Sequence, residues 1–140
     1  QLLKVDPEFD DKWRESVFPG GCSHAGELET SMMLHLAPES VRTEKIKSEI
    51  AKFNQTGSKY IWGDLFGKGA MGLVEWTSQY SESGVMGEAE KATAEKGRIV
   101  FEEASQNLAE FIEEYYHRKI ESRKRHQAEE PTFPLSFPTD

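Results

Sequence analysis

Ser23-His24-Ala25-Gly26-Glu27-Leu28-Glu29-Thr30-Ser31 is the stretch of sequence that decides the fold and the candidate site. It brings one histidine, two carboxylates and hydroxyl side chains together directly after the loop Pro19-Gly20-Gly21. An apolar run begins within it and predicts a helix over residues 27–37, which Pro38 ends. His24 stands just before that helix, within reach of solvent or substrate, and imidazole is the side-chain group used most often for proton transfer. It is therefore a candidate for general acid–base catalysis.

The same stretch also has a purely structural interpretation. His24 would then be an ordinary loop histidine, and Glu27, Glu29 and Thr30 would be capping groups in the first turn of the helix. Composition alone does not decide between the two interpretations.

Nucleophilic catalysis is a further alternative for this stretch. Ser23 or Ser31 could act as the nucleophile with His24 as its base, but neither serine lies in a G-x-S-x-G turn and no third orienting group is visible. A thiolate–imidazole pair between Cys22 and His24 is disfavoured, because residues so close in sequence rarely reach the geometry that the pair needs.

A metal site formed by this stretch alone is excluded by its spacing. His24 and His35 are eleven residues apart, which on one helix is roughly 16 Å, too far for a shared ion. The chain has no His-Glu-x-x-His motif and no pair of cysteines. We therefore predict no complete metal site within this chain.

Further elements are predicted on both sides of the stretch. Apolar residues four apart indicate a short amphipathic helix over 7–17, and Thr43 is the expected N-cap of a helix that extends to Phe53. Residues 59–62 and 73–77 have the composition of strands. A long helix is predicted from Glu88 to about Ser122, with acidic residues in its first turn and basic residues in its last.

The chain is expected to form one domain with a tail. Its length of 140 residues suits a single domain over 1–122 with a core of useful size. Residues 123–140 contain three prolines and predict an extended tail, in which the alternating Phe133, Leu135 and Phe137 could dock on a neighbour.

Gly67-Lys68-Gly69-Ala70-Met71-Gly72 matches the G-x-G-x-x-G pattern of dinucleotide-binding loops. That function requires a strand before the run and a helix after it, so that a helix N-terminus meets the pyrophosphate. Because residues 73–77 favour a strand, we interpret the run as a glycine-rich connection between strands. Dinucleotide binding is kept as a weaker alternative.

Charge and composition limit the classes of partner. With 17 basic and 25 acidic residues the net charge is −8, which argues against nucleic acid as a partner. The basic residues near Arg118 and Arg123 are interpreted as a helix C-terminus rather than a binding patch. A single cysteine favours a reducing compartment, so a cytoplasmic location is expected. No apolar run approaches the roughly 20 residues of a membrane span.

Two separated motifs resemble the creatininase (creatinine amidohydrolase) family. Residues 24–31 resemble its H-A/G-G-x-x-E-T-S signature. Gly84-Val85-Met86-Gly87 followed by residues 92–97, Ala-Thr-Ala-Glu-Lys-Gly, resembles the G-x-x-G and A-T-A-E-K-G pattern at the start of the family's last helix. The resemblance extends over roughly residues 15–120 and corresponds to the C-terminal half of the family's domain.

The resemblance implies a fold and a chemistry. The fold would be the C-terminal part of a three-layer α/β/α domain around a mostly parallel sheet. The activity would be metal-dependent hydrolysis of a non-peptide amide C–N bond in a small molecule, with two divalent ions (Zn, Mn or Fe). His24 matches the family's proton-transfer histidine, and orienting or substrate-facing roles are expected for Ser23, Glu27, Glu29, Thr30 and Ser31.

The family's metal-ligand segments, Glu-x-His…Asp and His-x-Glu, do not occur in this chain. We therefore expect an N-terminal portion of the same protein to supply most of the ligands. It could be a separately cleaved chain that remains associated, in an oligomer that the resemblance implies to be a hexamer. Residues 20–23 also differ from the Trp-Asp-x-Glu run of creatininase itself, so creatinine is not expected as the substrate. The alternative function is a non-catalytic oligomerisation or binding module.

Overall fold

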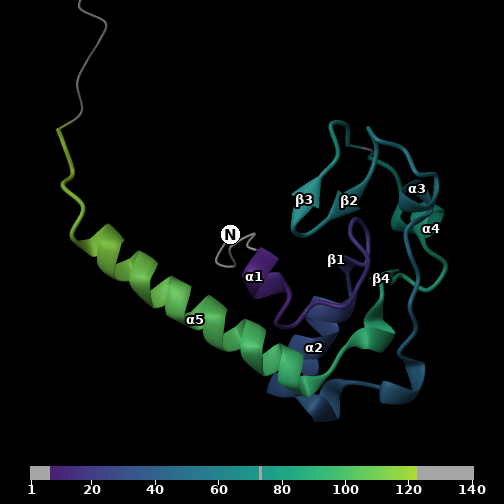
Figure 1. Cartoon of the computed structure of the whole chain (residues 1–140), viewed down its shortest axis with the longest axis horizontal. Helices are drawn as coiled ribbons and strands as arrows, with labels where there is room; N and C mark the ends of the chain where they lie inside the picture. The colour runs from purple at the N-terminus through teal and green to yellow at the C-terminus, as the bar shows by residue number, and fades with distance from the viewer. Residues whose placement is uncertain (1–6, 73, 123–140) are drawn as a thin grey trace, which may run out of the picture.

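A computed structural model describes residues 7–72 and 74–122 of the chain. Figure 1 shows a small body of short elements from which one long helix extends. The helices and strands are α1 (Pro7–Asp10), β1 (Cys22–His24), α2 (Glu27–Leu36), α3 (Lys52–Gln55), β2 (Gly63–Asp64), β3 (Gly67–Lys68), α4 (Thr77–Tyr80), β4 (Met86–Gly87) and α5 (Ala94–Tyr116). Three single turns of 3-10 helix lie at Pro38–Ser40, Thr43–Lys45 and Ala89–Lys91. The tail predicted over 123–140 lies outside the described residues.

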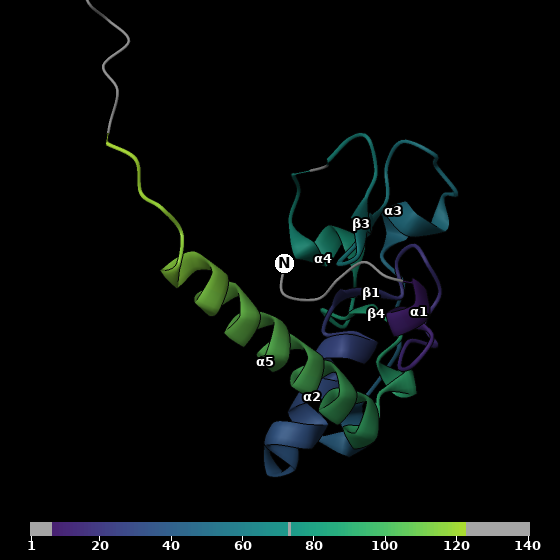
Figure 2. The ribbon, with the colours of Figure 1, turned by 60° about the vertical axis from the view of Figure 1, so that its left-hand side comes forward.

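The packing of α2 against α5 is the main helix–helix contact of the fold (Figures 1 and 2). The two helices approach closely because Gly97 of α5 has no side chain. A Cβ built there would lie 2.0 Å from the carbonyl oxygen of Ser31. Thr93 caps α5, its side chain accepting a hydrogen bond from the Lys96 N–H at 3.2 Å. The contact fixes the start of α5 beside the candidate site.

The strands of the described part form two short antiparallel pairs. In one pair, Cys22 and His24 of β1 face Gly87 and Met86 of β4. In the other, β2 and β3 form a hairpin, because the two residues that join them allow only an antiparallel return. The resemblance implied a mostly parallel sheet, and neither of these pairs is parallel. The mixed α/β character expected from the sequence is confirmed.

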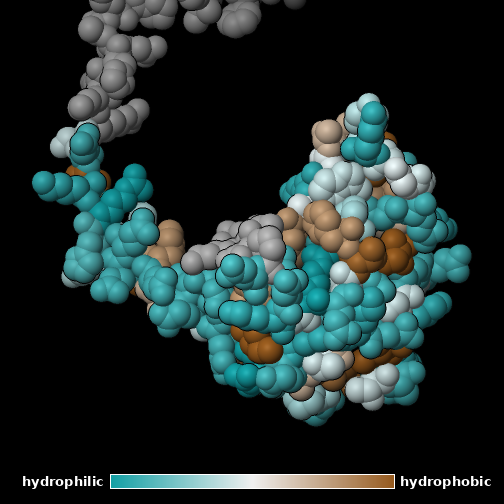
Figure 3. All heavy atoms as spheres, in the orientation of Figure 1, coloured by the Kyte–Doolittle hydropathy of each residue, from teal (hydrophilic) through white to brown (hydrophobic). Residues whose placement is uncertain are grey.

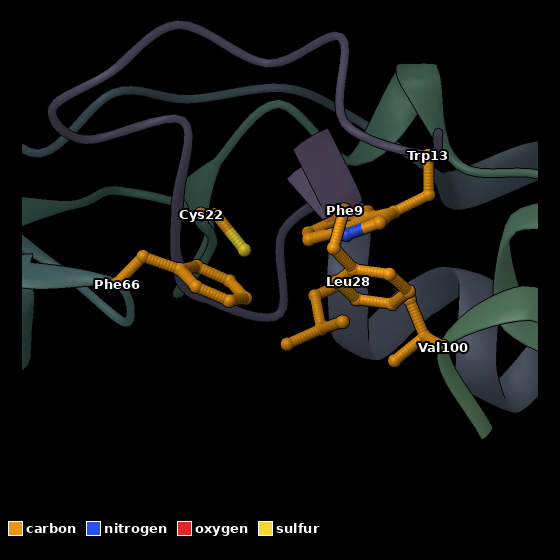
Figure 4. Packing of buried hydrophobic residues seen from close by; sticks show 6 residues of the cluster. All are labelled: Phe9, Trp13, Cys22, Leu28, Phe66 and Val100. Carbon is orange, nitrogen blue, oxygen red and sulfur yellow. The ribbon is translucent and has the colours of Figure 1, made fainter. Parts of the chain in front are cut away.

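The hydrophobic core lies where α1, β1, α2, the β2–β3 hairpin and α5 meet (Figure 4). The rings of Trp13 and Phe66 are 5.5 Å apart at their centroids. The core residues are Phe9, Trp13, Cys22, Leu28, Phe66 and Val100. Segments far apart in sequence are thereby fixed around β1, the strand that ends at His24.

A buried ion pair connects the N-terminal segment to the hairpin. Arg14 donates from both terminal nitrogens to Asp64, at 3.0 and 2.7 Å, and the Asp64 side chain is fully buried. The same carboxylate accepts a hydrogen bond from the Gly20 N–H at 2.8 Å. Burial would lower the pKa of Arg14, but the hydrogen bond and the charge of Asp64 raise it above its ordinary value. The loop before β1 is therefore held by a charged anchor.

Several predicted helix boundaries are wrong, and for one of them the cause is tertiary pairing. The helix expected from Thr43 to Phe53 is replaced by a 3-10 turn and α3, because Glu49 pairs with Gly87 through two backbone hydrogen bonds that require extended chain. The helix over 7–17 ends at Asp10. The long helix is Ala94–Tyr116 instead of Glu88 to about Ser122, and a 3-10 turn precedes it.

The strand predicted over 73–77 is also wrong for the residues that the structure describes there. The second strand of the hairpin, β3, lies earlier, inside the glycine-rich run. Residues 74–76 form no strand, and α4 begins at Thr77; Leu73 lies outside the described residues. Within 7–72 and 74–122, no helix is both long enough and apolar enough to cross a membrane.

Candidate functional site

His24 stands at the exposed end of β1, two residues after the buried Cys22. Its strand is fixed on one side by pairing with Met86. On the other side the Ser23 hydroxyl donates to the Gly63 carbonyl at 2.8 Å, and the Leu65 N–H donates to the Cys22 carbonyl at 2.7 Å. The structure therefore presents the imidazole to solvent from a backbone that is held on both sides.

The residue after His24 has an unusual backbone conformation. Ala25 adopts a φ of +48°, in the left-handed region that L-residues with a side chain rarely occupy. The Glu29 carboxylate accepts a hydrogen bond from the Ala25 N–H, and the Thr30 hydroxyl donates to the Ala25 carbonyl at 3.2 Å. Both backbone groups of Ala25 are therefore held by the first turn of α2. Strained backbone of this kind occurs often at functional sites, where it fixes a neighbouring side chain.

Glu27 is completely buried and directed into the protein. Its carboxylate accepts hydrogen bonds from the N–H groups of Glu15 and Ser16 at 2.8–3.1 Å. It also forms an ion pair with Lys96, whose Nζ lies 2.6 Å away. Burial would lower the pKa of Lys96, but its bonds to Glu27 and Glu15 raise that pKa above its ordinary value. Any orienting role of Glu27 thus acts through the 15–16 loop and α5.

The two serines considered as nucleophiles have other partners. Ser31 is fully buried, and its hydroxyl accepts a hydrogen bond from the Thr93 N–H at 3.1 Å, which joins α2 to the cap of α5. Ser23 donates to Gly63. The described structure shows no hydrogen bond from either hydroxyl to His24, so it does not favour a serine–histidine pair.

A reactive cysteine is also disfavoured. Cys22 is 1 % exposed and belongs to the core. Burial and the nearby Asp64 carboxylate raise the pKa of the Cys22 thiol to about 12, so the group stays protonated at neutral pH. The structural interpretation of this cysteine is favoured.

The glycine-rich run does not have the geometry of a dinucleotide loop. Gly67 and Lys68 form β3 itself, and the next helix, α4, begins only at Thr77 and is four residues long. Gly69 packs against the backbone of Tyr60 and Trp62, where a Cβ would lie 2.7 Å from the Tyr60 carbonyl oxygen. The run therefore serves the close approach of two chain segments, and among the residues described after it no helix begins before Thr77 to receive a pyrophosphate.

Sequence reasoning missed three charged residues that support the site. Arg14, Asp64 and Lys96 each take part in a buried ion pair. Arg14 and Asp64 pair with each other across 50 residues of sequence, and Lys96 pairs with Glu27 across 69. No local sequence pattern therefore points to these pairs. The only available sequence indication was that Lys96 lies in the motif shared with the family's last helix.

The residues in the described ranges do not form a metal centre. No group of three or more His, Cys, Asp or Glu side chains among them is placed to hold an ion. His35 contacts Phe101 of α5, with ring centroids 6.0 Å apart, and is thus held in the helix–helix contact. The candidate site is therefore a positioned histidine with a supporting network.

Comparisons of this chain with known proteins agree on one family. The model of the creatininase family, described as creatinine amidohydrolase, matches residues 4–112. A mycofactocin precursor peptide peptidase of Mycobacterium tuberculosis (strain H37Rv) is 37 % identical over 100 residues, which are 71 % of this chain and 35 % of that protein. The protein of the same name from Mycobacterium ulcerans is 33 % identical over 94 residues, 67 % of this chain and 33 % of its own length.

The fold is likewise similar to a solved structure. A mutant creatininase complexed with creatine superposes with a TM-score of 0.59 at 24 % identity, over 84 % of this chain and 41 % of that one. This likeness confirms the α/β creatininase-like fold. The chain spans about a third of the length of the curated relatives that it matches.

Proposed function

The chain belongs to the creatininase family, and from this we propose that it carries the proton-transfer histidine of a metal-dependent hydrolase that cleaves an amide C–N bond. The observation that supports this most directly is the exposed His24, followed by Ala25, whose two backbone groups are held by α2. A catalytic group must meet a substrate atom in a fixed geometry, and a fixed backbone limits the positions of its side chain.

The chain's own residues take separate roles in this proposal. His24 gives a proton to the leaving nitrogen or stabilises the tetrahedral intermediate. Glu29 and Thr30 are positioning residues, because they hold the backbone of Ala25. Glu27 and Ser31 fix α2 against α5. Glu27 does so through its ion pair with Lys96, and Ser31 through the hydrogen bond that it accepts from the Thr93 N–H.

In this proposal, the metal ligands lie mainly outside the described residues. A divalent ion in such a hydrolase supplies an activated water. The residues described here do not fit a metal centre, so no step is derived through one. We propose that two ions (Zn, Mn or Fe) are held mainly by an N-terminal portion of the same protein, and that the complete assembly is a homo-oligomer.

The substrate class is broader than the sequence indicated. The expectation was a non-peptide amide of a small molecule. The relatives are named as peptidases of a precursor peptide, so the restriction to non-peptide bonds is not supported. We propose an amide bond as the substrate class, with peptides included.

A second candidate function, an oligomerisation or binding module, is favoured by one observation. The outer half of α5 carries large apolar side chains that the rest of the described chain leaves exposed: Leu108, Phe111, Ile112 and Tyr115. A helix face of this kind is typical of an interface. A non-catalytic module would show the interface without amide hydrolysis.

The test begins with intact mass spectrometry and metal analysis of the purified chain with any polypeptide that co-purifies. Hydrolysis of a panel of peptides and small amides is then compared between the wild type and His24→Ala. We expect His24→Ala to lower the rate by about 100-fold or more, the usual contribution of a positioned acid–base group. The matched control is His117→Ala, which removes an exposed histidine at the end of α5 and should leave the rate unchanged.

Two results would contradict the proposal. One is full amide hydrolysis by His24→Ala, which would remove the histidine from the chemistry. The other concerns an assembly in which mass spectrometry finds every expected polypeptide but metal analysis finds no metal. If such an assembly hydrolyses no amide of the panel even after Mn²⁺ or Zn²⁺ is added, the binding module is favoured.

A further inference from the structure

A cavity of about 410 Å³ lies beside β1, and its lining includes Ser23, Gly63 and Met86, which also hold the strand that ends at His24. Ser23 of β1 and Met86 of β4 line one side, and residues of α3, α4 and the β2–β3 hairpin line the others. Because Met86 is also the pairing partner of His24, the cavity begins next to the candidate site. On the face shown in Figure 3, hydrophobic surface forms several separate patches, some toward the β2–β3 side of the body and others lower on the body, with hydrophilic surface between them.

The walls of the cavity suit a ring-sized apolar group. Phe53, Trp62 and Tyr80 line it. Phe53 and Tyr80 meet edge to face with centroids 5.0 Å apart, and Trp62 is held in the same way by Phe18 at 5.6 Å. Aromatic walls that are themselves fixed by packing offer flat surfaces for stacking. A volume of this size is in the range of small-ligand pockets.

Two polar groups of the lining lack partners among the described residues. The Tyr80 hydroxyl is buried without a hydrogen bond, and such a group costs free energy unless a ligand or water satisfies it. Lys68 is exposed at the cavity and forms no ion pair with residues 7–72 or 74–122. The one carboxylate in the lining, Asp64, is already paired with Arg14. The polar groups free to act are therefore a hydroxyl donor and a cation.

We propose that this cavity binds a ring-sized apolar group that bears a carboxylate, with the ring between the aromatic walls and the carboxylate on Lys68 and the Tyr80 hydroxyl. The claim that this group is the part of the substrate that the protein recognises rests on the proposed function. The claim that the cavity binds such a group does not. A carboxylate is the anion chosen because its two oxygens can accept hydrogen bonds from a cation and from a hydroxyl donor.

The test is a calorimetric titration of the purified chain, with any co-purifying polypeptide, using phenylacetate, phenylacetamide and acetate as probes. We expect phenylacetate to bind, phenylacetamide to bind more weakly and acetate not to bind at millimolar concentration. Lys68→Gln should weaken phenylacetate binding about 10-fold, as expected for a charged hydrogen bond, and leave phenylacetamide binding unchanged. Tyr80→Phe should weaken the binding of phenylacetate about fivefold.

The matched controls are Lys59→Gln and Tyr60→Phe, which alter an exposed lysine and tyrosine nearby that do not line the cavity. Both should bind phenylacetate as the wild type does. Equal weakening by Lys59→Gln and Lys68→Gln, or no phenylacetate binding at all, would overturn the proposal. His24→Ala should bind phenylacetate with unchanged affinity. If phenylacetate binds but no amide is hydrolysed, only the proposed function is contradicted. If an amide is hydrolysed but phenylacetate does not bind, only the proposed ligand of the cavity is contradicted.

Discussion

The ammonium group of Lys96 lies 2.6 Å from Oε1 of Glu27, and this buried pair joins the first turns of α2 and α5 across 69 residues of sequence. The same carboxylate holds the backbone of the 15–16 loop. One side chain therefore connects three segments directly behind the candidate site.

Removal of this carboxylate should be strongly destabilising. In Glu27→Ala, Lys96 would remain buried with one partner fewer and two backbone N–H groups would lose their acceptor. We expect the free energy of unfolding to fall by about 3–5 kcal/mol, as for other buried ion pairs from which one partner is removed. Urea denaturation measures it. The control, Glu102→Ala, removes an exposed partner of Arg98 and should cost no more than about 1 kcal/mol; similar losses for the two variants would contradict this account.

Gly97→Ala should destabilise the protein, although alanine is the better helix former. Helix propensity alone predicts a gain of about 1 kcal/mol inside a helix. At this position the added Cβ would lie 2.0 Å from the Ser31 carbonyl oxygen, so α2 and α5 must separate. We expect a net loss of about 1–3 kcal/mol in chemical denaturation. Ser105→Ala, an exposed change in the same helix, is the control, and a Gly97→Ala variant more stable than wild type would refute the close contact.

The left-handed conformation at Ala25 predicts an order of stability among substitutions. Glycine adopts positive φ freely, whereas a β-branched residue resists it most. We expect Ala25→Val to be about 1–2 kcal/mol less stable than Ala25→Gly in thermal or urea unfolding. Because His24 precedes this residue, its imidazole NMR signals should shift in the valine variant and stay close to wild type in the glycine variant. The reverse order of stability would place Ala25 in another backbone conformation.

Glu49 predicts a pH dependence of stability in the acid range. Its carboxylate accepts hydrogen bonds from the Ser83 hydroxyl and from the N–H groups of Glu82 and Ser83, which lower its pKa from 4.5 to about 2. A carboxylate with a lowered folded-state pKa contributes stability that is complete above the unfolded value and is lost as the pH falls through the folded one. That loss should therefore occur from about pH 4.5 to 2.

The measurement is the unfolding free energy of wild type and Glu49→Gln as a function of pH. The wild type should be the more stable protein near neutral pH, and the difference should vanish toward pH 2. Glu44→Gln, a change at an exposed residue outside this network, is the control. A constant difference between wild type and Glu49→Gln across the acid range would show that the 82–83 loop does not stabilise the charged form.

The sequence by itself determined the elements that depend on local pattern. The apolar run after Gly26 predicted a helix over 27–37, and α2 is Glu27–Leu36. The periodic apolar residues predicted a long helix, which exists as α5 with shorter bounds than expected, and the loop–histidine–helix order placed His24 just before α2. These predictions hold because helix periodicity and breaking residues act over only a few positions.

Tertiary structure alone decided which of the nearby polar residues face inward. Glu27 and Glu29 are two positions apart, yet the first is buried on Lys96 and the second lies at the surface and holds Ala25. The pairing of Arg14 with Asp64 and the bridge from Glu49 to Gly87 are equally invisible in local sequence. The physical reason is that a charge or an extended backbone group is stabilised by whichever partner packing brings to it, and here those partners are 38 to 69 residues away.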